Sequence, residues 1–215
     1  MLKKIEVLLH GCNLRILRRV KPLHLKPLIL WPIQFEGESF FTTNLKTPKR
    51  FDLIAYRAII PDRGITTLVH RVCGVPGDVA EMKAGTLYVN GKDVDADLSL
   101  KQIYKVSTKY AGALEYKEAE AFIIPPYTDT VYIPLEDDKV KKDQLPCQRY
   151  VLPAGLRDDG IFRIYQKNWN RDNFGPLRVP SDKFFVLGDN RGHAMDSRYI
   201  GLIAQDKVMG TVLWK

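Results

Sequence analysis

The segment at residues 188–201, GDNRGHAMDSRYIG, concentrates polar side chains that could do chemistry. It contains the carboxylates Asp189 and Asp196 and the guanidinium groups of Arg191 and Arg198, and the stretches on either side, FFVLG and LIAQDKVMGTVLW, are rich in apolar residues. Charged groups that are buried between strands are stable only when opposite charges pair. We therefore expect a buried, mutually paired cluster here.

This segment resembles the last signature motif of type I signal peptidases, which reads GDNR, a short spacer, then DSR and a glycine. Three earlier segments resemble the preceding motifs of that family in the same order: FEGESFFTTN (35–44), KRFDLIAYRA (49–58) and HRVCGVPGDVAEMKAGTLYVNGK (70–92). The third is the fullest match, with an Arg-Val pair, a Gly-x-Pro-Gly-Asp turn and a Leu-Tyr-Val-Asn-Gly hairpin. Together the motifs cover about residues 35–92 and 165–215.

The resemblance places the family's serine nucleophile at Ser39. The family motif continues with Met, a variable residue, Pro and Thr; here Phe40 and Thr42 stand at the Met and Pro positions, and Thr43 matches. A serine hydroxyl attacks a carbonyl when a neighbouring base accepts its proton. By the same resemblance, the backbone N–H of Ser39 is an oxyanion donor.

The general base implied by the resemblance is His70, because bacterial members carry a lysine at this position, directly before the arginine. A lysine can act as a base at pH 7 only if its pKa is lowered from about 10.4 to near 7, and this shift requires more than about 4 kcal/mol of desolvation. Histidine, with an ordinary pKa near 6.5, is already mostly neutral at pH 7. Signal peptidases of the endoplasmic reticulum and of archaea similarly carry histidine here.

Asp196 completes the catalytic set that the resemblance implies. Bacterial members hold their lysine with a serine two positions before this aspartate, and here that position is Ala194. A carboxylate beside a histidine base fixes the tautomer of the ring and stabilises the imidazolium. We therefore expect a Ser39–His70–Asp196 triad.

The other polar and glycine residues of the motifs are interpreted as structural supports, and we expect Arg71 to pair with an acid of the closing motif. These supports are Arg71, Gly77, Asp78, Asp189, Asn190, Arg191 and Arg198. His193 is interpreted as a solvated loop residue, and it is the next candidate base if His70 is not the base.

Most of the chain beyond residue 30 has the pattern of β-strands. FDLIAYRAII, TTLVHRVCGV, FFVLG and VMGTVLW are apolar, β-favouring runs, and GTLYVNGKDV breaks at Asn90-Gly91, a strong hairpin signal. Residues 99–121 have helical potential, and 168–180 is interpreted as a loop that leads back into the core. Cys73 lies in an apolar run and is expected to behave as a small core residue.

The expected fold is therefore mainly β, and the resemblance implies a coiled antiparallel sheet of the signal peptidase type. We expect a discontinuous catalytic core at 31–92 and 165–215, a cap-like subdomain inserted at 93–164, and an N-terminal helix within residues 1–30.

The N-terminal segment is basic and amphipathic. Residues 7–35 contain no acid, and apolar residues recur at helical spacing up to Pro22, followed by the apolar run PLILWPIQF. Such a segment is typical of attachment to an anionic membrane surface, although a helix that packs on the protein itself has the same pattern. No stretch reaches the length of a membrane span.

The net charge of +8 is compatible with a nucleic-acid or membrane partner, but no nucleic-acid-binding motif accompanies it, so nucleic acid is not expected. The resemblance implies a serine endopeptidase that removes signal peptides from exported preproteins, cutting after an extended segment with small residues. It implies no metal or organic cofactor, and an active site on the outer face of the cytoplasmic membrane. The alternative is an inactive relative that kept the fold and serves as a binding or scaffolding protein.

Overall fold

The computed structural model describes residues 31–214 apart from 36–37, 61–63, 113, 115–120 and 123–128. The basic segment at residues 1–30, with its expected helix, lies outside the described residues. Within the described ranges, every helix is too short or too polar to cross a membrane.

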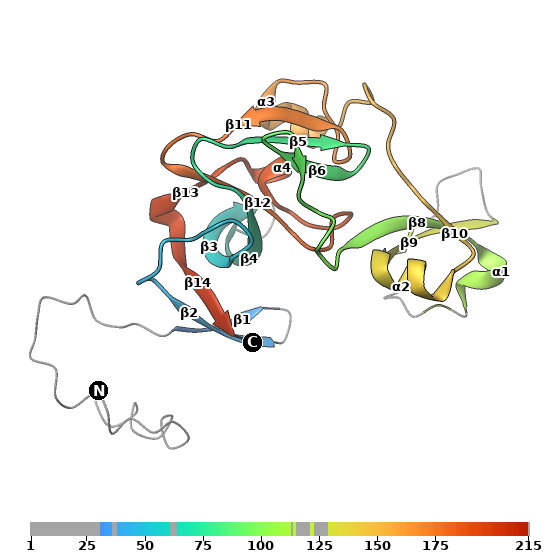
Figure 1. The fold of residues 1–215 in the computed structure, drawn as a ribbon, viewed down its shortest axis with the longest axis horizontal. Coiled ribbons are helices and arrows are strands. Elements are labelled where there is room, and N and C mark those ends of the chain that lie inside the picture. Colours follow the sequence, from blue (N-terminus) through green and yellow to red (C-terminus); the bar gives the residue numbers. More distant parts are fainter. Residues whose placement is uncertain are drawn as a thin grey trace, which may run out of the picture.

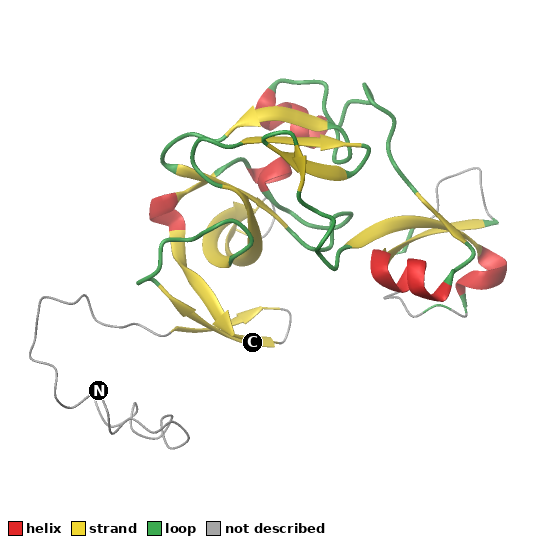
Figure 2. Ribbon diagram, in the orientation of Figure 1, coloured by secondary structure: helices red, strands yellow, loops and turns green. Residues whose placement is uncertain are grey.

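Seven strands in the described part of the chain form the main sheet, in the spatial order β1-β2-β14-β3-β4-β12-β13 with every neighbouring pair antiparallel (Figure 1; Figure 2). They are β1 (Trp31–Phe35), β2 (Glu38–Thr43), β3 (Leu53–Ile60), β4 (Gly64–Gly74), β12 (Lys183–Leu187), β13 (Ile203–Ala204) and β14 (Val208–Trp214). Although three strands separate β1 from β4 in this order, the two approach each other, with Cα atoms within 8 Å. The sheet is therefore coiled, as the sequence predicts.

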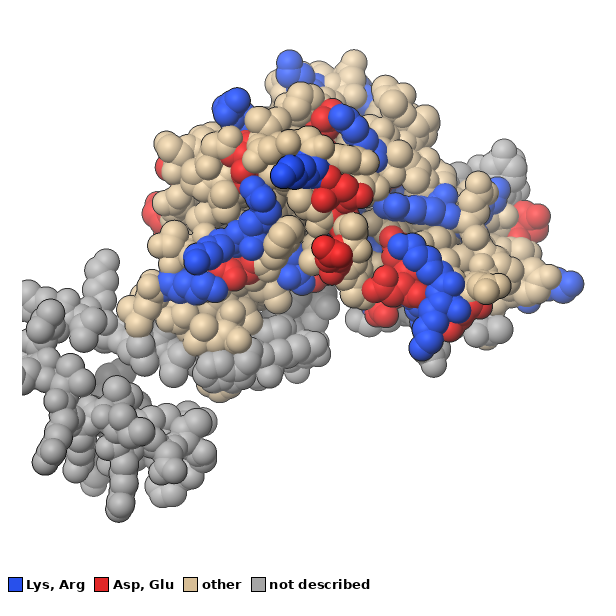
Figure 3. All heavy atoms as spheres, in the orientation of Figure 1, with Lys and Arg blue, Asp and Glu red and all other residues tan. Residues whose placement is uncertain are grey.

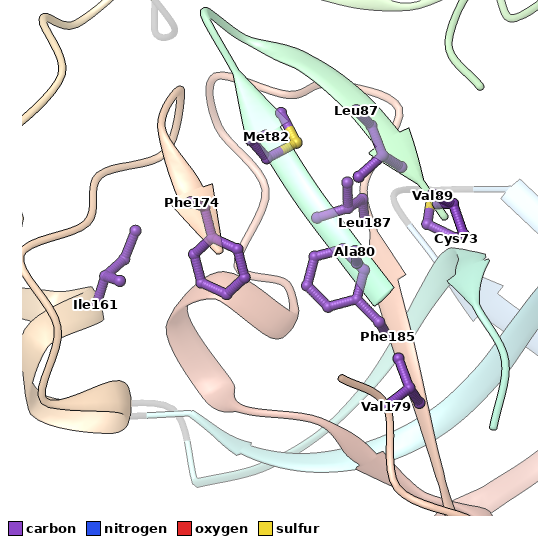
Figure 4. Close-up of a cluster of buried hydrophobic side chains, with 10 residues drawn as sticks. All are labelled: Cys73, Ala80, Met82, Leu87, Val89, Ile161, Phe174, Val179, Phe185 and Leu187. Carbon is purple, nitrogen blue, oxygen red and sulfur yellow. The ribbon is translucent and has the colours of Figure 1, made fainter. Parts of the chain in front are cut away.

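A second sheet covers one face of the main sheet and encloses the larger core cluster (Figure 4). Its order is β11-β5-β6-β7, with bounds Phe174–Arg178, Val79–Lys83, Thr86–Val89 and Lys92–Asp93. Phe185 and Leu187 of β12 face this cluster, whereas Phe184 and Val186 face a second cluster on the opposite side. Because both faces of β12 are covered, its sequence is apolar at consecutive positions. Cys73 is fully buried in the larger cluster, as expected.

The inserted region forms a third sheet that stands apart from the other two (Figure 1). Its order is β10-β8-β9, with bounds Cys147–Arg149, Lys101–Ser107 and Thr130–Glu136, and α1 (Thr108–Ala111) and α2 (Asp137–Asp143) follow β8 and β9. Tyr104, Val106 and Ile133 belong to an apolar cluster of its own. We call this sheet with its two helices the cap.

Three sequence-based expectations differ from the structure. Residues 101–107 form β8 rather than helix, because their β-branched and aromatic side chains pair with the apolar strand β9. Within the expected loop at 168–180, β11 pairs with β5; it is an edge strand, where Pro176 removes no hydrogen bond from a central ladder. Finally, α3 (Asp159–Tyr165) begins inside the expected insertion at 93–164, but its Ile161 packs in the larger core cluster.

Candidate active site

His70 lies on β4 with its ring buried against the neighbouring strand β3. The register pairs His70 with Ile54 and Leu68 with Tyr56, so His70 and Tyr56 are diagonal neighbours on one face of the sheet. The hydroxyl oxygen of Tyr56 is 2.7 Å from Nδ1 of His70, and the two side chains are 0% and 7% exposed.

The electrostatic surroundings of His70 favour the neutral ring. Burial is the largest cause and lowers the pKa of His70 below its ordinary value. The charges of Asp196 and Asp189 act in the opposite direction, and that of Arg198 acts with burial. A neutral imidazole is the form that can accept a proton.

The opposite edge of the His70 ring faces Gly188, the first residue of the closing motif. A Cβ atom at Gly188 would lie 3.4 Å from Cδ2 and 3.5 Å from Nε2 of His70, and it would overlap the Cβ atom of Ala194. A larger residue at 188 therefore has no room, and the glycine leaves no side chain over Nε2.

Asp196 is fully buried and caps the N-terminus of α4 (Ser197–Ile200). Its Oδ1 accepts hydrogen bonds from the backbone N–H and Nε of Arg198, at 3.1 and 2.9 Å. Its Oδ2 accepts from Nη2 of Arg198 at 2.7 Å and from the backbone N–H of Gly188 at 3.1 Å. Burial is the largest single effect and opposes ionisation of Asp196, but the charge and hydrogen bonds of Arg198, the charge of His70 and the hydrogen bond from Gly188 together hold the pKa of this carboxyl below its ordinary value.

The sequence-predicted triad is thus placed only in part. His70 and Asp196 are close enough to interact electrostatically, but the hydrogen bonds of Asp196 go to Arg198 and Gly188, and that of Nδ1 goes to Tyr56. Ser39 lies on β2 opposite Gln34 of β1, and its side chain is outside the described residues. The approach of β1 to β4 brings the β1–β2 hairpin to the strand that carries His70.

Arg71, the residue after His70, is held by the closing motif. Its Nε and Nη2 donate to the two carboxylate oxygens of Asp189 at 2.8 and 2.6 Å, and its Nη1 donates to the carbonyl oxygen of Phe51 at 3.0 Å. This bidentate pair joins β4 to Asp189, the residue that follows Gly188. It therefore holds the backbone of Gly188 close to the strand that carries His70.

The remaining predicted supports lie farther from His70. Asp78 accepts two hydrogen bonds from Arg50, at 2.8 and 2.7 Å, and others from Asn90 and from the backbone N–H of Val75. Gly77 precedes it with a φ of 89°, which favours glycine. Both therefore hold the turn between β4 and β5.

The closing motif also contacts the residues that lead into the cap. Arg191 forms a buried bidentate pair with Asp95, at 2.6 and 2.7 Å, and Asn190 forms a parallel bridge with Lys101, the first residue of β8. His193 is exposed, in agreement with its interpretation as a solvated loop residue.

Tyr56, Arg50 and Asp95 were not identified by sequence reasoning. Tyr56 could have been found from the hairpin alone: once residues 53–60 and 64–74 are taken as neighbouring antiparallel strands, their register makes it the diagonal neighbour of His70. Arg50 and Asp95 carry no comparable local signal, because their partners Asp78 and Arg191 lie 28 and 96 residues away.

Comparisons with known proteins identify the family to which the chain is similar. Residues 32–215 match the family model described as signal peptidase, peptidase S26. The chain is 30% identical over 186 residues to signal peptidase I T of Bacillus subtilis (strain 168), covering 85% of this chain and 66% of that protein, so it spans about two thirds of that relative's length. It is 28% identical over 218 residues to signal peptidase I S of the same strain, covering 97% and 88%. A crystal structure of a signal peptidase I from Enterococcus faecalis V583 is similar with a TM-score of 0.39 and 23% identity, over 78% of this chain and 98% of that chain.

Proposed function

The chain belongs to the signal peptidase family, peptidase S26, and on that premise we propose that it is a serine endopeptidase that removes signal peptides from exported preproteins. Ser39 is the proposed nucleophile and His70 the proposed general base. The observation that carries the proposal is the environment of His70. Its ring is buried, Nδ1 is hydrogen bonded, and a glycine lies beside Nε2.

In the proposed reaction, Nε2 of His70 accepts the proton of the Ser39 hydroxyl as its oxygen attacks the carbonyl carbon of the scissile peptide bond. The imidazolium then gives that proton to the leaving amine as the C–N bond breaks and the acyl-enzyme remains. Water, deprotonated by the same ring, attacks the ester, and the proton returns to Ser39. The backbone N–H of Ser39 stabilises the oxyanion.

Asp196 supports this chemistry through its charge and through its hold on Gly188. The carboxylate is ionised and buried, so its field favours the imidazolium that forms on His70. Its hydrogen bond from the Gly188 N–H fixes the backbone beside Nε2. Arg198 holds Asp196 in turn and is itself fully buried.

We also propose that the protein works at an anionic membrane surface, with its active site outside the cytoplasm. Residues 1–30 contain seven Lys or Arg and one acid, so six of the eight net positive charges lie there. The rest of the chain is close to neutral, and on the face shown in Figure 3 basic and acidic side chains are interspersed. Ile59 and Ile65 add an exposed apolar pair near the end of the β3–β4 hairpin, at 78% and 75% exposure.

Replacement of the nucleophile tests the proposed activity. In the full chain, Ser39→Ala should lower kcat/KM for a preprotein with an Ala-x-Ala segment by at least about 1000-fold. The exposed Ser181→Ala variant is the matched control and should keep full activity. Turnover by Ser39→Ala equal to that of Ser181→Ala would exclude Ser39 as the nucleophile. A wild-type chain that binds the preprotein but never cleaves it would instead indicate the inactive binding protein.

A further inference from the structure

Tyr56 occupies the position at Nδ1 that a carboxylate fills in a Ser–His–Asp triad. Its hydroxyl oxygen is 2.7 Å from Nδ1 of His70, within hydrogen-bonding distance. The two rings are 5.9 Å apart between centroids and are inclined at 50°. Tyr56 itself is 0% exposed and packs in the cluster with Ile54, Val72 and Val186, so its ring is held by apolar contacts on β3, β4 and β12.

The carboxylate of Asp196 is not available for this position. An ionised carboxylate has about four lone-pair sites for hydrogen bonds. Asp196 accepts four hydrogen bonds, three from Arg198 and one from Gly188. If one of these oxygens turned toward Nδ1, the fully buried Arg198 guanidinium would lose hydrogen bonds to the carboxylate.

A tyrosine hydroxyl can either donate to Nδ1 or accept from it, and only one arrangement suits a base. If the hydroxyl donates, the neutral ring carries its proton on Nε2 and cannot accept another there. If the hydroxyl oxygen accepts from Nδ1–H, Nε2 is free to take a proton. Once Nε2 has taken it, both ring nitrogens carry protons, and the oxygen of Tyr56 remains the acceptor for Nδ1–H.

We propose that Tyr56 is the positioning residue of His70: its hydroxyl oxygen accepts the Nδ1–H hydrogen bond, fixes the tautomer and leaves Nε2 as the proton acceptor. The proposal rests on the proposed role of His70 as the general base. It replaces the expected Ser39–His70–Asp196 hydrogen-bond chain with one that ends on a neutral oxygen, while Asp196 acts by its charge.

The groups that face His70 set the expected pH behaviour. They are Tyr56 from β3, Asp196 and Arg198 from the start of α4, and Asp189 from the segment after β12. The two aspartates favour the imidazolium, and burial and Arg198 oppose it. A hydrogen-bond acceptor at Nδ1 also favours the imidazolium, so its removal must lower the pKa of His70 further.

Tyr56→Phe, which removes only the hydroxyl, is the direct test. We expect kcat/KM to fall about 10- to 100-fold through kcat, the size expected of a hydrogen bond to a group that becomes charged. The acid limb of the kcat/KM profile should move about one pH unit lower. The matched control is Tyr104→Phe, which removes the hydroxyl with which a buried tyrosine of the cap donates to Asp137 at 2.7 Å, and it should change neither quantity.

The tautomer gives a readout that does not depend on activity. With His10, His24 and His193 replaced and the remaining histidine labelled with ¹⁵N, the neutral ring of His70 should carry its proton on Nδ1 in the wild-type background. In Tyr56→Phe, the Nε2–H form should increase. A wild-type ring protonated on Nε2, or an acid limb that stays in place in Tyr56→Phe, would overturn the proposal. Full activity of His70→Ala would instead refute the proposed function, whatever the tautomer.

Discussion

A buried ion pair joins Asp196 to Arg198 near the proposed site. Both residues are fully buried, and three of the four hydrogen bonds to the carboxylate come from Arg198. Breaking a buried pair by neutralising one partner costs about 3–5 kcal/mol, because the other charge stays buried without compensation. Asp196→Asn should therefore lower the free energy of unfolding by about that amount.

The shape of the Asn side chain adds to this cost. One of its two terminal groups is an NH₂ that donates rather than accepts. Whichever oxygen position it takes, it meets N–H donors: Arg198 N and Nε at Oδ1, or Arg198 Nη2 and Gly188 N at Oδ2. Two of the four hydrogen bonds are therefore lost in either orientation.

Urea unfolding of Asp196→Asn at several pH values measures this effect. The control is Asp206→Asn, whose carboxylate is 74% exposed and 3.9 Å from Lys207; an exposed pair contributes about 1 kcal/mol or less. Because the folded-state pKa of Asp196 is lowered, its contribution is fully present above the unfolded value of about 3.9 and is lost as the pH falls through the folded-state pKa. The difference in the free energy of unfolding between wild type and Asp196→Asn should therefore become smaller below about pH 4.

The reasoning would be refuted if Asp196→Asn lowered the free energy of unfolding by less than about 1 kcal/mol at pH 7, or if the loss stayed constant down to acid pH. If Asp196→Asn does not fold, the double variant Asp196→Asn/Arg198→Met provides the measurement. Removing the unpaired cation should restore folding, and a double variant no more stable than the single one would contradict an electrostatic origin.

Two further predictions concern pH and membranes. Because burial lowers the pKa of His70, and the neutral ring is the active form, kcat/KM should fall on the acid side with a midpoint below the ordinary value of about 6.5; an acid limb above pH 8 would identify another base. The full chain should co-sediment with vesicles containing anionic lipid more strongly than with neutral ones, and removal of residues 1–30 should abolish the difference; equal binding to both vesicles would exclude an electrostatic attachment.

The strands of the core could be predicted because their determinants are local. Period-two alternation and apolar runs locate β3, β4, β6, β12 and β14 to within a few residues. The hairpin at Asn90-Gly91 follows from backbone preference, since both residues have positive φ, 52° and 79°. Positive φ at both central residues is the conformation that a two-residue hairpin turn of type I′ requires.

The parts that could not be predicted depend on partners distant in sequence. Residues 101–107 are individually compatible with a helix. They form a strand because they pair with β9, an apolar strand about thirty residues later in the chain. The expected buried pairing within residues 188–201 is seen between Asp196 and Arg198, but how many hydrogen bonds of the carboxylate this pair takes could not be predicted. The motif places the acid near the base, but Arg198, two residues away, takes three of its four hydrogen bonds.

The crowding of polar groups in residues 188–201 has a physical cause in these contacts. Residues of this one short segment contact different elements: the side chain of Asp189 pairs with Arg71, the neighbour of His70, and its carbonyl oxygen accepts a hydrogen bond from the backbone N–H of Lys101 at the start of the cap. The carboxylate of Asp196 accepts a hydrogen bond from the backbone N–H of Gly188, which lies next to Nε2 of His70. A segment that contacts Arg71, the cap and the end of β12 at once needs polar side chains, because the backbone and charged groups buried at these contacts must be hydrogen bonded within the protein. The same polar residues that look like a reaction centre in the sequence are therefore mainly the supports that hold His70 between Tyr56 and Gly188.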